Sequence, residues 1–71
     1  MDLSLANEGV EYLIEDVVTD DEELNSFLFS LGCYSGETIT IVSKKAKTMV
    51  VAIKDARYTI DYQLAEAIKI K

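Results

Sequence analysis

The residues of this 71-residue chain that could perform chemistry are one cysteine and thirteen acids, because histidine is absent. Cys33 would need an activating base to serve as a nucleophile, and no lysine lies near it in sequence. It stands just past an apolar segment, between Gly32 and Tyr34, so we expect a buried and unreactive thiol. Adjacent acids such as Glu15 and Asp16 could form an acid–base pair. They fall at a predicted strand end, where they remain solvated, so we expect no enzyme and no catalytic residue.

We expect neither a resident metal nor a cofactor. Tight transition-metal sites use imidazole or thiolate ligands, and this chain offers at most one thiolate. The acid run Asp20–Glu23 could attract a hard cation weakly, but it lacks the spaced oxygen ligands and the turn glycine of a calcium loop. The three glycines are not spaced to form a phosphate-binding loop. Binding to another molecule is therefore the expected activity.

Length and composition predict a single globular domain that spans residues 1–71. Hydrophobic residues make up 49% of the chain and charged residues 28%, which is typical of a folded domain. A chain this short buries only about 60% of its unfolded surface. Its core therefore leaves little room for a deep active site of ~300 Å³ or more. One cysteine cannot form an internal disulfide, which favours a reducing compartment.

No membrane segment or signal peptide is expected. The longest uninterrupted apolar run is Met49–Ile53, far shorter than the ~20 residues that span a bilayer. The N-terminus lacks the basic region and apolar run of a secretory signal. We expect a cytoplasmic protein without direct membrane insertion.

Charge divides the chain into two unequal halves. Residues 1–37 contain ten acids and no base, whereas residues 38–71 contain seven bases and three acids, which gives −10 and +4. Such a split can steer association with a charged partner. The alternative is that the two halves lie against each other and partly neutralise. Nucleic acid is not an expected partner, because phosphate binding needs a net basic surface and the chain carries −6 overall.

One amphipathic helix is predicted. Its apolar residues recur at i, i+3, i+4 and i+7, which places them on one helix face: Leu24, Phe27, Leu28 and Leu31. Thr19 or Asp20 is expected to cap the helix start, with Glu22 or Glu23 completing a capping box. Gly32 fits the left-handed residue that ends a helix.

The rest of the chain alternates between apolar and polar residues with a period of two, which predicts strands. The expected strands cover residues 10–18, 38–42, 48–54, 57–60 and 68–70. Asp61 can cap a short helical turn before the last strand. Five short strands in so few residues are best buried in a small closed barrel, which also removes exposed strand edges. The predicted fold is mainly β, with one α-helix after the first strand.

The sequence resembles the ferrous iron transport protein A family, FeoA, along essentially its whole length. The resemblance rests on Leu3-x-Leu5, Gly9, Tyr12-x-Ile14, Leu28-x-x-Leu31-Gly32, Ser35-Gly36, Ile39-x-Ile41-Val42, Tyr58-x-Ile60 and Leu64-Ala65-x-x-Ile68-x-Ile70. It implies a five-stranded SH3-like barrel with a helix inserted after the first strand. It also implies a cytosolic accessory of bacterial ferrous iron uptake, which acts on the membrane transporter FeoB through its cytosolic G-protein portion.

Two other functions stay open at this point. The resemblance extends to the C-terminal domain of metal-dependent repressors, so the chain could be a free-standing regulatory domain that senses a transition metal ion or a peptide. Strand edges and apolar surface on so small a barrel also allow a weak homo-oligomer.

Candidate partner-binding residues lie on the helix and on the turn behind it. Phe29 falls off the predicted apolar helix face, so we expect it to be exposed. Cys33, Tyr34 and Glu37 belong to the turn that precedes the second predicted strand. The acids that could guide a partner toward this region are Asp20, Asp21, Glu22 and Glu23.

Overall fold

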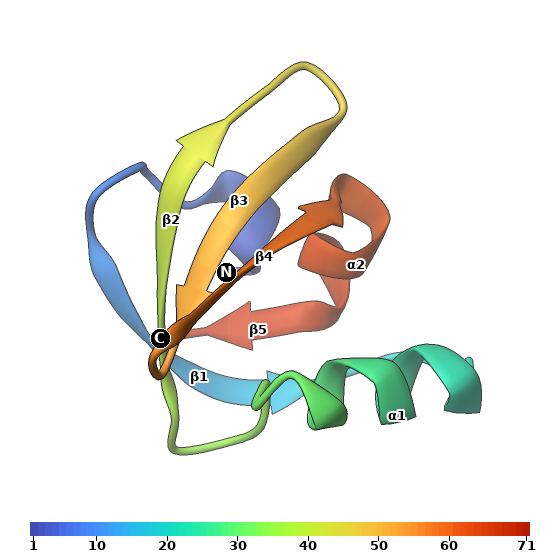
Figure 1. Ribbon diagram of the computed structural model, residues 1–71. Helices are drawn as coiled ribbons and strands as arrows, with labels where there is room; N and C mark the ends of the chain where they lie inside the picture. The colour runs from blue at the N-terminus through green and yellow to red at the C-terminus, as the bar shows by residue number, and fades with distance from the viewer.

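A computed structural model describes residues 1–71 and shows five antiparallel strands in one strongly curled sheet (Figure 1). The strands are β1 (Glu11–Val17), β2 (Thr38–Lys44), β3 (Thr48–Ile53), β4 (Ala56–Asp61) and β5 (Ile68–Ile70). They lie in the order β4-β3-β2-β1-β5. Helix α1 (Glu22–Ser30) is inserted after β1, and the short helix α2 (Tyr62–Ala67) precedes β5. The predicted fold class is confirmed.

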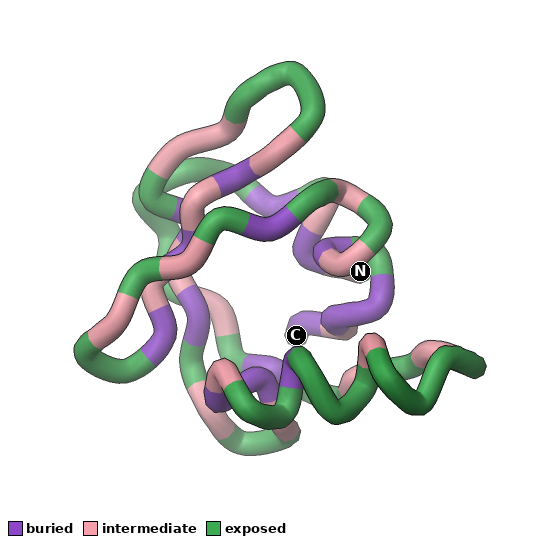
Figure 2. The backbone as a smooth tube through the Cα atoms, turned by 45° about the vertical axis from the view of Figure 1, so that its right-hand side comes forward, coloured by how far each residue is buried: buried purple, intermediate pink, exposed green.

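Alternation along the strands places the apolar side chains inside the barrel. In β3, Met49, Val51 and Ile53 are buried while the residues between them are partly exposed, as the period-two geometry of a strand requires. Ile39 and Ile41 of β2 are buried by the same rule. All fifteen buried hydrophobic residues form one cluster, and no polar or charged residue is buried. Figure 2 shows buried residues alternating with half-buried and exposed ones along the strands.

The N-terminus completes the barrel beside β5. Asp2 forms an isolated bridge with Lys69, and the Ile70 N–H donates to the Met1 carbonyl at 2.9 Å. The 3-10 helix η1 (Leu3–Leu5) follows, and Leu3 is fully buried. Sequence patterns did not predict this turn. The sheet order ends at β4 and β5, and α2 joins these two strands and contacts η1.

Helix α2 begins as predicted. The Asp61 carboxylate accepts the Leu64 N–H at 2.8 Å, and the two helix residues Ala65 and Ala67 are buried. Neither helix of the chain has the length and apolar character needed to cross a membrane.

The predicted start of α1 was wrong by one residue. Asp21, not Thr19 or Asp20, is the N-cap, and its carboxylate accepts the N–H groups of Glu23 and Leu24 at 3.0 and 3.2 Å. The Thr19 hydroxyl instead accepts the Asp21 N–H at 3.1 Å and shapes the turn before the cap. The third residue after Asp21 is Leu24, which cannot return a hydrogen bond to the cap, so the predicted capping box is absent.

The apolar face of α1 is narrower than predicted. Leu28 is its only buried residue, Leu24 is half-buried, and the Phe27 side chain is 48% exposed. Successive residues turn by about 100° around a helix, so Phe27 and Phe29 lie on the two flanks of Leu28. The helix packs on the barrel through Leu28, with Leu24 half-buried, and most of its residues are exposed (Figure 2). Phe27 lies outside this narrow contact.

Gly32 ends α1 and brings the helix close to the barrel. It has φ +96°, and a Cβ at this position would lie 3.2 Å from Ile53 Cγ2. Gly36 has the same φ of +96°, but a Cβ added there would have no atom within 4 Å. Both glycines therefore occupy the left-handed region of the backbone, but only Gly32 is packed closely against another residue.

Gly32→Ala should consequently cost about 1 kcal/mol more stability than Gly36→Ala, because only the first substitution overpacks against a buried core residue. Both variants carry the same penalty for an L side chain at positive φ. Urea denaturation followed by circular dichroism measures both. Equal losses would show that Ile53 moves aside without cost.

Candidate functional site

A pair of aromatic rings, one from an exposed residue and one from a half-buried residue, marks the surface where α1 ends. The ring centroids of Phe29 and Tyr34 lie 5.0 Å apart, with the ring planes inclined by 61°. This edge-to-face contact is a favoured aromatic geometry. Phe29 is nevertheless 55% exposed, so the contact covers only part of its ring. We refer to Phe29 and Tyr34 as the aromatic pair.

Lys54 joins the aromatic pair to the turn between β3 and β4. Its Nζ donates to the Tyr34 hydroxyl, lies 4.9 Å from the Tyr34 ring centroid, and lies 3.9 Å from Glu37 Oε1. The hydrogen bond to Tyr34, together with the Glu37 carboxylate, raises the pKa of Lys54 above its ordinary value. Two of the predicted contact residues, Tyr34 and Glu37, are thus linked by a cation that sequence patterns had not singled out.

The backbone of Lys54 is strained. With φ +56° it is the only non-glycine residue in the left-handed region, a conformation that is costly for a residue with a Cβ. Its side-chain stem lies over Gly32, where a Cβ would meet its Cε at 3.5 Å. Lys54 is the first residue of the two-residue turn between β3 and β4, since Ile53 pairs with Ala56, and hairpin turns of this length favour a positive φ.

Two open grooves border the aromatic pair. The first, the β1 groove, has a volume of about 590 Å³ and lies between the end of β1, α1 and the turn after α1. The second, the hairpin groove, has a volume of about 400 Å³ and lies beside the β3–β4 turn that carries Lys54. Phe29, Ser30 and Tyr34 line both grooves. The aromatic pair therefore forms the wall between them.

Cys33 lies at the floor of the β1 groove with its side chain almost inaccessible, since the residue is 2% exposed. Its N–H donates to the Leu28 carbonyl at 2.9 Å, which fastens the turn to the end of α1. Burial raises the pKa of the thiol to about 11. The buried thiol expected from the sequence is found here.

The Cys33 thiol should react slowly with an aromatic disulfide reagent at pH 8. A rise in pKa from 9.0 to about 11 leaves roughly one hundredth of the thiolate that an unfolded chain would present. Reaction in strong denaturant should therefore be at least about a hundredfold faster than in buffer. Absorbance of the released thiolate measures both rates, and similar rates would contradict a packed turn.

The four acids Asp20, Asp21, Glu22 and Glu23 lie at the other end of α1 from the aromatic pair. Asp21 is engaged as the N-cap, and all four side chains are exposed. No group of three or more histidine, cysteine, aspartate or glutamate side chains is placed to hold a metal ion anywhere in the chain. The acids are thus not assembled into a metal centre.

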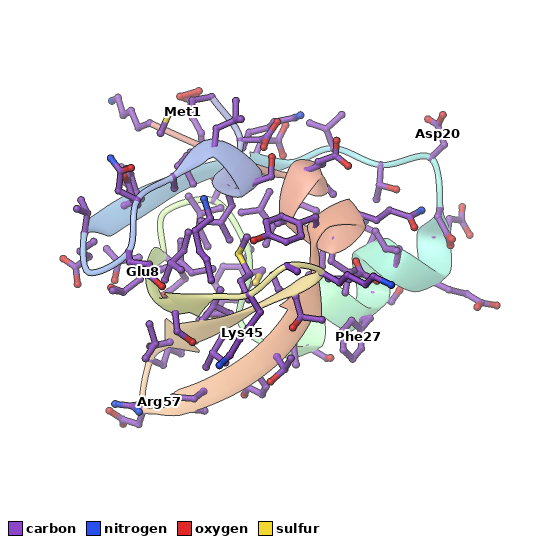
Figure 3. The ribbon with its side chains drawn as sticks, turned by 90° about the horizontal axis from the view of Figure 1, so that it is seen from above. Met1, Glu8, Asp20, Phe27, Lys45 and Arg57 are labelled. Atoms are coloured by element: carbon purple, nitrogen blue, oxygen red, sulfur yellow. The ribbon has the colours of Figure 1, made fainter.

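The two charged halves neutralise each other only slightly. The single ion pair is Lys54–Glu37, which joins one half to the other. Lys44 donates instead to the carbonyls of Ser4 and Ala6, at 3.2 and 2.8 Å. Figure 3 shows Asp20 and Arg57 on opposite sides of the molecule. Most charged side chains therefore form no ion pair, and the exposed acids at the start of α1 lie away from Arg57.

Of the other tyrosines, two are anchored in the fold. The Tyr12 hydroxyl accepts the Asn7 N–H at 3.0 Å, and the Tyr62 hydroxyl donates to the Lys45 carbonyl at 2.7 Å. Sequence patterns missed Lys54 and also the polar residues of the β1 groove. The sequence does carry a weak sign of this groove. Three small uncharged polar residues interrupt the acidic and apolar pattern of α1, and all three line the groove: Asn25, Ser26 and Ser30.

Comparison with known proteins places this geometry in a family. A family model described as the FeoA domain matches residues 1–71. FeoA of Stenotrophomonas maltophilia, a prokaryotic SH3-domain protein solved in complex with zinc, is similar in structure with a TM-score of 0.89 and 20% identity. The match covers 100% of this chain and 89% of that one. A comparison with curated protein sequences finds no match.

Two longer proteins contain a similar unit. Iron(II) transport protein A of Clostridium thermocellum has a TM-score of 0.90 and 27% identity, over 100% of this chain and 44% of that one. A manganese-dependent transcriptional repressor has a TM-score of 0.89 and 18% identity, over 99% of this chain and 40% of the repressor. The SH3-like fold is thus shared with FeoA proteins and with part of a metal-dependent repressor.

Proposed function

This chain belongs to the FeoA domain family of ferrous iron transport, and from that premise we propose that it is a non-enzymatic cytosolic accessory of ferrous iron uptake. We propose further that it binds the cytosolic G-protein portion of the membrane transporter FeoB and modulates transport. The observation that carries the proposal is the family match, which extends over all 71 residues.

The surface around the aromatic pair supports a role in protein binding. Aromatic residues are enriched at the centres of protein interfaces, where a partly exposed ring can enter a partner's pocket. Phe29 provides such a ring at 55% exposure, and a groove lies on each side of it. Tyr34, Glu37 and Lys54 surround it with polar groups, the arrangement of an interface rim.

The features of the site favour binding over catalysis. Both grooves are open, whereas catalytic sites exclude water. The only thiol is buried with its pKa raised to about 11, the opposite of an activated nucleophile.

The rival function, a free-standing domain that senses a metal ion, draws support from the repressor likeness. The two proteins share a fold, but their sequences are only 18% identical. The residues of this chain do not assemble the ligand set that a transition metal needs. Binding to FeoB is therefore the function that the site supports best.

Titration calorimetry tests the proposal directly. The cytosolic G-protein portion of FeoB from the same organism, loaded in turn with GDP and with a non-hydrolysable GTP analogue, is titrated with this chain. We expect saturable one-to-one binding in at least one nucleotide state, with a Kd of about 1–100 μM, as for transient signalling complexes.

No heat of binding at about 200 μM of either protein, with both shown to be folded, would contradict direct engagement. Saturable binding of ferrous or manganous ion to the chain alone at physiological salt would favour the metal-sensing rival.

A further inference from the structure

The β1 groove has a lining suited to a cationic, planar side chain. It contains the Asp16 carboxylate, the Asn25 amide, the rings of the aromatic pair and several serine hydroxyls, and it contains no lysine or arginine. We propose that this groove binds a guanidinium group, an arginine side chain presented by an exposed segment of the partner protein. The identity of that partner rests on the proposed function, whereas the chemistry of the bound group comes from the groove itself.

Asp16 supplies the charge at the β1 side of the groove. Its Oδ1 accepts the Val17 N–H at 2.8 Å, which fixes the carboxylate at the strand end. Asp16 forms no ion pair within the chain and its side chain is exposed, so it remains available to a ligand. A fixed carboxylate next to open space matches the fork of donors that a guanidinium presents.

Helix α1 supplies neutral acceptors on the opposite side. The Ser30 hydroxyl donates to the Phe27 carbonyl at 2.6 Å, so its oxygen can still accept a hydrogen bond. The Asn25 and Ser26 side chains lie one turn earlier along the helix and line the same groove. With Asp16, they allow several of the five guanidinium N–H donors to be satisfied at once.

The aromatic pair supplies a stacking surface. Tyr34 already carries a cation, because Lys54 Nζ lies 4.9 Å from its ring centroid on the side of the hairpin groove. Phe29 has no such occupant and is 55% exposed. Arginine stacks on aromatic faces and sheds its hydration more readily than lysine does, so a groove that combines a ring with a carboxylate favours arginine.

Charge favours a cationic ligand in this groove. The groove is lined by residues between 16 and 35, and no base is among them. An anion would meet the Asp16 carboxylate there, because the two bases close by lie outside the lining: Lys69 opposite Asp16 on β5, and Lys54 beside Tyr34. The same field attracts a basic segment of a partner and raises its rate of encounter.

The test uses ¹⁵N-labelled chain and two short peptides. The first is acetyl-Ser-Leu-Arg-Leu-Ser-amide, and the second replaces arginine with citrulline, which keeps the shape and removes the charge. We expect the arginine peptide to cause saturable amide shifts at residues of the β1 groove, and the citrulline peptide to bind at least about fivefold more weakly. A lysine version should also bind more weakly than the arginine peptide.

A matched pair of variants locates the charge. Asp16→Asn keeps an oxygen that can accept the Val17 N–H and should weaken binding of the arginine peptide about fivefold. Glu15→Gln removes the same charge from the neighbouring residue, which does not line the groove, and should change affinity less than about twofold. Equal effects of the two variants, equal binding of the citrulline peptide, or no saturable shift up to about 10 mM peptide would each overturn the inference.

The same variants separate this inference from the proposed function. If FeoB binds wild type and Asp16→Asn equally, the arginine site is wrong and the proposed function stands. If the peptide binds as expected while FeoB does not bind, the groove chemistry stands and the proposed partner is wrong.

Discussion

Replacing Leu28 with alanine should lower the free energy of unfolding by about 2–5 kcal/mol, the range found when a buried leucine is truncated. Leu28 is fully buried and is the only buried residue of α1. Its carbonyl also accepts the Cys33 N–H that fastens the following turn. A domain of this size has a total stability of only about 5 kcal/mol. The cavity should therefore leave the chain barely folded or unfolded.

Phe27→Ala is the matched control for this prediction. It removes a larger apolar side chain from the preceding helix position, but that side chain is 48% exposed, so the loss should be about 1 kcal/mol or less. Urea denaturation followed by far-ultraviolet circular dichroism measures both variants. The Cys33 thiol of Leu28→Ala should also react faster than that of wild type. Equal stability losses for the two variants would contradict the packing of α1 on the barrel.

Phe29→Ala should weaken binding to the cytosolic portion of FeoB by about 10- to 100-fold, the loss typical of a central aromatic contact at an interface. Phe29 is exposed where the two grooves meet, so truncating it removes apolar contact with a partner in both. Its stability cost should be about 1 kcal/mol, because only the edge contact with Tyr34 is lost. Titration calorimetry measures the affinity and a thermal melt confirms the fold.

Phe27→Ala is again the matched control. Phe27 lies on the same helix, two residues away, with a similar exposed fraction, but it lines neither groove. We expect Phe27→Ala to bind FeoB within about twofold of wild type. If Phe27→Ala loses as much affinity as Phe29→Ala, the binding surface is the free face of α1 and not the aromatic pair.

Local signals predicted the secondary structure well. Alternation of Ile39, Ile41, Val51 and Ile53 marks two strands, because strand geometry itself has a period of two. The end of α1 at Gly32 and the cap of α2 at Asp61 were also predicted, since each depends on one residue and its immediate neighbours. The start of α1 shifted by one residue among consecutive acids, where several side chains could serve as the cap.

Features that depend on contacts distant in sequence were missed. The burial of Leu3 in η1 depends on the N-terminus reaching β5 at the far end of the chain. The exposure of Phe27 depends on how α1 lies against the barrel, which helical periodicity alone does not determine. The register shift in β2 between Ile41 and Ser43 is likewise a property of the pairing with β3.

In the candidate site, too, the features set by local sequence were predicted and those set by contacts distant in sequence were missed. Exposure of Phe29 and burial of Cys33 follow from helix periodicity and composition, and both were anticipated. The link from Tyr34 to Lys54 crosses 20 residues of sequence and depends on the strained β3–β4 turn. Asp16 comes beside α1 only because the chain folds back after β1. The partner-binding role of all these residues stays a prediction.

The most direct measurement is an NMR titration of ¹⁵N-labelled chain with the unlabelled cytosolic G-protein portion of FeoB. We expect saturable shifts and line broadening centred on Phe29, Ser30 and Tyr34 and extending to Asp16 and Lys54 on the two sides. The β2–β3 turn, with Lys45 and Lys47, should stay unperturbed. Perturbation centred on that basic turn, or no perturbation at concentrations where both proteins are folded, would contradict the claim that the aromatic pair is the surface that binds the transporter.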